Sequence, residues 1–177
     1  MDAGKRNFII SAVAYHIILI WGVMFKFSWT DNLSIWEQHL FTVLERFRMG
    51  LGFFAAFKSP QALLDMALNC LIFIPSGIYL GGIMRGWKAV LCGFCMTVAV
   101  ELTQLFTGLG GFSLTDIFAN FVGAGMGVLL FKAYLRRVDG KILKGINRVT
   151  AIVFSIVCVY AIVSVIIVFP EYYEWVH

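Results

Sequence analysis

Acidic and amide side chains recur inside long apolar stretches of this sequence, where polar groups are costly and usually face a bundle interior or a cavity. Three stretches each carry an acid followed three or four residues later by an amide: Asp65 with Asn69, Glu101 with Gln104, and Asp116 with Asn120. Residues at this spacing share one face of a helix. The pattern predicts three helices that turn polar faces toward one another.

Helical rise predicts that these faces meet at a common depth. At 1.5 Å per residue, Asn69 lies roughly 12 Å, and Glu101 and Asn120 roughly 8 Å, from the outer ends of their helices. Lys26 ends the first apolar stretch at a similar depth, and Arg46 follows in the next segment. An ionised carboxylate in lipid requires a cation nearby. We therefore predict one polar pocket in the outer leaflet, with cations beside the acids.

The predicted pocket suits either catalysis or binding. Glu101 and Asp116 are the candidate catalytic residues, because two acids can act as general acid and base. The candidate substrate-binding residues supply hydrogen bonds and charge: Asn69, Gln104, Asn120, Lys26, Arg46 and Asp65. Alternatively, the same groups only join the helices, through hydrogen bonds that contribute about 0.5–2 kcal/mol each.

Other motifs have structural explanations. Ala119, Gly123 and Gly127 recur at every fourth position, which predicts close helix packing. Cys92 and Cys95 have C-x-x-C spacing but lie in an apolar helix, outside the context of a redox motif. The sequence contains no His/Cys metal spacing and no phosphate-binding loop, so we expect no cofactor and no metal site.

Composition predicts the elements that position these residues. The chain is 60% hydrophobic and 14% charged, whereas soluble domains are nearer half and one quarter. This excludes a soluble enzyme or a disordered chain and predicts an all-α integral membrane protein. We predict one membrane domain over 1–177, with five spans at about 8–27, 61–80, 88–106, 115–135 and 149–169.

The segment 28–59 is too polar to span. Ser34 and Glu37 have capping-box spacing, apolar residues then follow on one helical face, and Gly50 and Gly52 interrupt the pattern. An amphipathic helix in the outer interface is predicted for this segment.

The basic residues predict the orientation. Ten of the fourteen Lys and Arg residues fall on the side of the N-terminus when the spans are threaded in order. The positive-inside rule then predicts a multi-pass protein of the cytoplasmic membrane with its N-terminus inside and its C-terminus outside. Because topology and contact with anionic lipid account for the net charge of +4, we expect no nucleic-acid partner.

The polar segments resemble the VanZ family of membrane proteins. The resemblance covers roughly residues 15–135 and is carried by Leu19–Lys26, Asn69–Gly77 (N-x-x-x-F-x-P-x-G), Glu101–Gln104 (E-x-x-Q) and Asp116–Gly123 (D-x-x-x-N-x-x-G). Many members have an Arg and a further acid just before the matching Asp, where this chain has Gly110–Thr115.

The resemblance implies a bacterial cell-envelope protein that gives low-level resistance to teicoplanin, a lipidated glycopeptide antibiotic, without replacement of the D-Ala-D-Ala target. The first interpretation is binding or modification of a membrane lipid or lipid-linked cell-wall precursor at the pocket, with the antibiotic itself as a further candidate partner. The alternatives are an intramembrane enzyme that uses Glu101 and Asp116, and a non-catalytic partner subunit held by the Ala119/Gly123/Gly127 face. The oligomeric state is not predicted.

Overall fold

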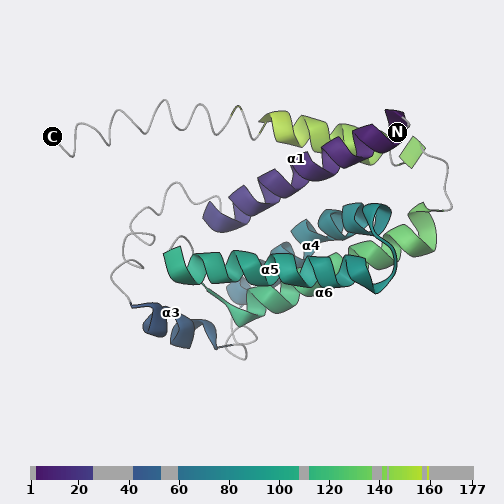
Figure 1. Cartoon of the computed structure of the whole chain (residues 1–177). Coiled ribbons are helices and arrows are strands. Elements are labelled where there is room, and N and C mark those ends of the chain that lie inside the picture. The colour runs from purple at the N-terminus through teal and green to yellow at the C-terminus, as the bar shows by residue number, and fades with distance from the viewer. Residues whose placement is uncertain are drawn as a thin grey trace.

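The computed structural model describes residues 3–25, 42–52, 60–107, 112–136, 141–142, 144–156 and 159. Those residues form helices and the turns between them, with no strand in the described part of the chain (Figure 1). The predicted all-α class is confirmed. Four helices are long and apolar enough to cross a membrane, as their composition predicts.

The membrane helices are α1 (Ala3–Phe25), α4 (Pro60–Ile83), α5 (Trp87–Thr107) and α6 (Leu114–Leu130), which continues as the π-helical turn η2 (Phe131–Leu135). Three of the four, α4, α5 and α6 with η2, begin and end within three residues of the predicted spans. The first helix begins five residues earlier than predicted, because its polar first turn extends beyond the apolar stretch. Of the predicted fifth span, 149–156 is helical, and most of the remainder lies outside the described residues.

Small residues bring α4 and α6 into the most extensive contact of the bundle. A Cβ atom on Gly123 would meet the backbone of Cys70, and one on Gly127 would meet the backbone of Ile74, both on α4. Backbone atoms cannot rotate away, so only glycine permits this approach. The predicted packing role of the small-residue face is confirmed, and α4 covers this face. A partner subunit would therefore need a different surface.

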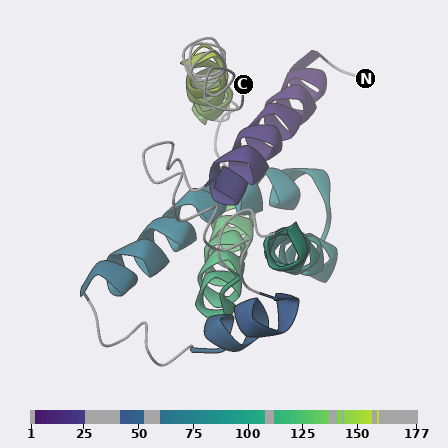
Figure 2. The same ribbon diagram turned by 90° about the vertical axis from the view of Figure 1, so that its left-hand side faces the viewer.

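Two side chains hold α1 against α4. The Tyr15 hydroxyl donates to the Ile72 carbonyl, and His16 Nε2 lies 3.0 Å from Ser76 Oγ. His16 Nδ1 lies 2.7 Å from the Ala12 carbonyl. A carbonyl only accepts, so Nδ1 carries the proton and Ser76 donates to Nε2. Figure 2 shows α1 crossing α4, with α5 and α6 viewed nearly along their axes.

A short helix, α3 (Val43–Gly50), lies outside the bundle at one end (Figures 1 and 2). It begins with a capping box in which the Thr42 side chain accepts from the Glu45 N–H and Glu45 accepts from the Thr42 N–H. The Phe47 ring stacks on Phe112, with 5.6 Å between centroids. The structure thus has a non-spanning helix within the segment 28–59, ending at Gly50. The predicted box at Ser34 lies outside the described residues.

Candidate functional site

Three of the predicted polar residues meet around one cavity of about 360 Å³ between α1, α4 and α6. Asp65 and Asn69 reach it from one face of α4, and Asp116 reaches it from the first turn of α6. Gly22, Val23, Leu68 and Ile72 supply the apolar remainder of the lining. We call this space the polar cavity. Its size is that of a small-molecule site.

Glu101, Gln104 and Asn120 form a second, fully buried layer, and none of them lines the polar cavity. Glu101 Oε2 accepts a hydrogen bond from the Ser113 N–H at 2.9 Å. The Ser113 hydroxyl in turn accepts from the Asp116 N–H at 3.2 Å, which caps the N-terminus of α6. Glu101 therefore orients the turn that places Asp116 at the cavity, to which it is linked by two hydrogen bonds through Ser113.

Gln104 connects the buried layer to α1. Its Nε2 donates to the Val23 carbonyl at 2.9 Å, and Val23 lines the polar cavity. This hydrogen bond joins α5 to the part of α1 that lines the cavity. Gln104 thus positions the α1 wall of the cavity rather than facing a ligand.

Asn120 differs from Glu101 and Gln104, which each make a hydrogen bond. Its side chain is fully buried, and neither Nδ2 nor Oδ1 has a hydrogen-bond partner among the described residues. Transfer of an amide from water to an apolar interior without a compensating hydrogen bond costs about 2–7 kcal/mol. Joining of the helices, the alternative explanation for these polar groups, does not account for an amide that bonds to neither neighbour.

Of the two predicted cations, Lys26 and Arg46, the structure describes only Arg46. Lys26 lies outside the described residues. Arg46 is on α3, at the end of the bundle nearest the polar cavity, and its Nε and Nη1 atoms are buried without a hydrogen-bond partner in the described part of the chain. Arg46 is not among the lining residues of the polar cavity.

Sequence reasoning missed residues that support the site. Ser76 shares a helical face with Asn69, but it bonds to His16 and does not line the cavity. Ser113 was missed as the partner of Glu101. The spacing Ser113-x-x-Asp116 is a helix N-cap signal that could have identified it. The α1 contribution at Gly22 and Val23 has no polar signal to reveal it.

The described residues contain no group of three His, Cys, Asp or Glu side chains that could hold a metal ion. Cys92 is half-buried and Cys95 is exposed on the bundle exterior, so only the first fits the predicted packing role.

The described lining of the polar cavity consists of two carboxylates, one amide and apolar residues.

Membrane-length helices around a carboxylate-lined cavity define a multi-pass membrane protein with a candidate ligand site. Residues 12–136 match the VanZ/LLP1 family model, so the chain belongs to this family. It is 28% identical to Protein VanZ of Enterococcus faecium over 123 residues, which cover 66% of this chain and 68% of the relative. The expected family resemblance is confirmed. No solved structure gives a significant match.

Proposed function

We propose that this protein reduces the action of the lipoglycopeptide teicoplanin at the outer membrane surface by binding or modifying an envelope lipid or lipid-linked cell-wall precursor in the polar cavity. Membership in the VanZ/LLP1 family supports the resistance role, because low-level resistance to teicoplanin is what the resemblance to this family implies. The observation that carries the mechanism is the meeting of Asp65, Asn69 and Asp116 around one cavity of about 360 Å³.

The lining chemistry selects the part of a lipid that would bind. Two carboxylates and one amide, with no cation among the described lining residues, favour hydrogen-bond donors such as hydroxyl or ammonium groups. Leu68 and Ile72 suit the apolar part that follows a headgroup. A glycopeptide antibiotic is too large for a cavity of this size, so a lipid headgroup fits better than the drug itself.

Catalysis is the second candidate function. Asp116 lines the cavity and is 8% exposed, whereas Glu101 is fully buried behind it. Of the two predicted catalytic acids, Asp116 is therefore the one that would contact a ligand, and Glu101 would act through the Ser113 turn. An enzyme changes the chemical composition of its lipid, and a binder does not.

One expression experiment tests both functions. The protein is produced in a teicoplanin-susceptible Gram-positive host, tolerance to teicoplanin and vancomycin is measured, and extracted lipid headgroups are compared with those of a vector control. We expect a larger gain in teicoplanin tolerance than in vancomycin tolerance. A changed headgroup profile identifies an enzyme, and an unchanged one identifies a binder.

Variants locate the effect in the polar cavity. Asp65→Asn and Asp116→Asn should each lower teicoplanin tolerance toward the vector level. Glu45→Gln makes the same charge change on α3, outside the cavity lining, and should retain tolerance. Equal gains for the two drugs, or equal losses in all three variants, would contradict a cavity-based mechanism at the membrane surface.

A further inference from the structure

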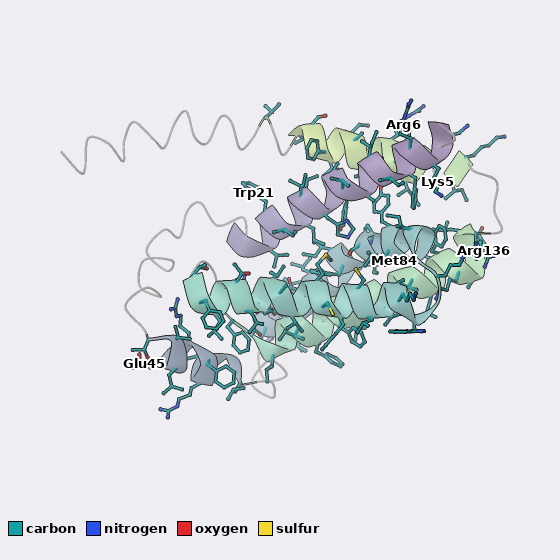
Figure 3. All side chains as sticks on the ribbon, in the orientation of Figure 1. Lys5, Arg6, Trp21, Glu45, Met84 and Arg136 are labelled. Atoms are coloured by element: carbon teal, nitrogen blue, oxygen red, sulfur yellow. The ribbon has the colours of Figure 1, made fainter. Side chains whose placement is uncertain are left out.

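A second and larger cavity, of about 840 Å³, lies at the other end of the same helices. We call it the basic cavity. Its described lining includes four cations and no Asp or Glu: Lys5 of α1, Arg85 in the turn after α4, Lys132 of η2, and Arg136 just beyond η2. Figure 3 shows Lys5 and Arg136 at the same end of the bundle as Met84, opposite Glu45 on α3.

An adjoining cavity of about 280 Å³ adds a fifth cation. It shares Lys5, Gly82 and Phe131 with the basic cavity and adds Lys144. Five cations from four separate segments therefore surround one continuous region. Like charges gathered in this way repel one another, so the arrangement favours an anion that neutralises them.

Topology and helix ends explain only part of this cluster. The positive-inside rule requires cations at one membrane face but not their convergence on a cavity. Lys132 Nζ donates to the Gly86 carbonyl at 2.9 Å, as a cation near helix C-termini does. Lys5 lies in the first turn of α1, where the helix dipole disfavours a positive charge. The helix dipole therefore explains the position of Lys132 but not that of Lys5.

Aromatic rings and glycines give the region an apolar floor. Phe8 and Phe131 lie with ring centroids 6.3 Å apart. A Cβ atom on Gly82 would come within 2.5 Å of the Phe8 ring, and one on Gly81 within 3.2 Å of Phe131 Cβ. These glycines let the rings pack directly against α4, below the cations. A charged rim over an apolar floor matches the headgroup and first carbons of a lipid better than a free ion.

The position along the helices fits the same ligand. The candidate spans begin at Gly4 and end at Ile83 and Leu135, each within one or two residues of a lining cation. The basic cavity thus lies where the hydrocarbon core meets the headgroups. We propose that it binds the phosphate of an anionic phospholipid headgroup, with Lys5, Arg85 and Arg136 as its cationic ligands.

The test uses the purified full-length protein in a neutral detergent. Binding is measured by native mass spectrometry and by the shift in thermal unfolding on addition of phosphatidylglycerol, phosphatidylcholine or inorganic phosphate. We expect phosphatidylglycerol to bind and to stabilise the protein most. Stabilisation by inorganic phosphate equal to that by phosphatidylglycerol would overturn the lipid assignment in favour of a soluble phosphate compound.

A matched pair of triple variants separates the cavity from net charge. K5Q/R85Q/R136Q removes three lining cations, whereas R6Q/K88Q/K141Q removes three exposed cations that line neither basic space. We expect the first to weaken phosphatidylglycerol binding at least about tenfold and the second much less, because each cation close to a headgroup contributes roughly a fivefold factor. Equal weakening, or no binding by the wild type, would overturn the proposal. The unfolding temperature in phosphatidylcholine shows that both variants are folded.

This proposal is independent of the function proposed for the polar cavity. Loss of phosphatidylglycerol binding with retained teicoplanin tolerance would separate the two sites, and loss of tolerance alone would concern only the polar cavity.

Discussion

The polar cavity and the basic cavity use opposite ends of α1, α4 and the α6–η2 helix, and their charged lining residues have opposite signs. Val23 of one lies eighteen residues after Lys5 of the other, which is roughly 27 Å of helix. That length is close to the hydrocarbon thickness of a bilayer, about 30 Å. One set of helices therefore presents hydrogen-bond acceptors to one leaflet and cations to the other.

The two ends also differ in how their polar and charged groups are held. At the polar end, Glu101 and Gln104 are fully buried behind the cavity and position its walls through hydrogen bonds. At the basic end, Lys5, Arg85 and Arg136 are exposed, long and flexible. A preorganised site selects a particular ligand geometry, whereas a flexible cationic rim accepts phosphate groups of varied headgroups. We infer that selectivity lies at the polar end.

The orientation of the two ends gives an all-or-none prediction. In a background without Cys70, Cys92, Cys95 and Cys158, a membrane-impermeant thiol reagent should label Leu51→Cys in intact cells. It should label Lys141→Cys only after permeabilisation. Both positions are exposed, at the α3 end and the basic end respectively. Labelling of Lys141→Cys alone in intact cells would exchange the leaflets assigned to the two cavities.

The packing of α4 against α6 supports both cavities, and we expect it to contribute more to the stability of the protein than any other single contact. Gly127→Val should destabilise the protein by more than about 3 kcal/mol, because its side chain would overlap backbone atoms of α4 that cannot move aside. The measurement is thermal unfolding in detergent. Gly125→Ala is the control: nothing lies within 4 Å of its Cβ position, and alanine should stabilise the helix by up to about 1 kcal/mol. Equal effects would show that this contact does not support the bundle.

Substitutions of Glu101 test whether this buried side chain supports the polar cavity by positioning its wall or by its charge. Glu101→Leu removes the acceptor of the Ser113 N–H and should cost about 1–3 kcal/mol. Glu101→Gln keeps an acceptor of the same size and should cost only about 1 kcal/mol, the difference between a charged and a neutral hydrogen bond. Unfolding and teicoplanin tolerance are measured on both.

The two readouts distinguish the roles of Glu101. Retained stability with lost tolerance in Glu101→Gln would show that the charge or the proton is needed at the site. Full tolerance in Glu101→Gln and a loss in Glu101→Leu would make Glu101 a positioning residue. Full tolerance in both would remove it from the site.

Acidification should give the smallest effect, confined to the α3 end. Hydrogen bonds from the Thr42 backbone and side chain lower the pKa of Glu45 below its ordinary value of 4.5. The capping box therefore stabilises α3 fully above that value, and this stabilisation is lost as the pH falls through the lowered pKa. The basic cavity has no described carboxylate in its lining and should not respond.

Hydrogen exchange in α3 and in η2, corrected for the intrinsic pH dependence, measures this difference. Glu45→Gln at neutral pH should reproduce the acid-induced loosening of α3 in part, because glutamine accepts a hydrogen bond without the charge. Equal loosening of α3 and η2 on acidification would contradict the assignment to the capping box.

The sequence by itself determined the helices and the faces on which their polar groups lie. Lipid leaves backbone groups no partner except those within a helix, so apolar stretches of about 20 residues predict α4, α5 and α6 to within a few residues. Helical spacing likewise predicts that Asp65 and Asn69 share a face. The glycines of α6 predict close packing, because only residues without a side chain allow two backbones to touch.

Only the tertiary structure decided which polar groups reach a cavity and which lie behind one. Spacing treats Glu101, Asn120 and Asp116 alike, but the packing of the helices, set by contacts distant in sequence, buries the first two. Asp116 lies one turn nearer the end of α6 than Asn120 and is left at the polar cavity. The crossing of α1 over α4 pairs Ser76 with His16 and brings Lys5 toward Arg136. Helix crossings depend on side-chain packing across the whole interface, which no short sequence pattern records.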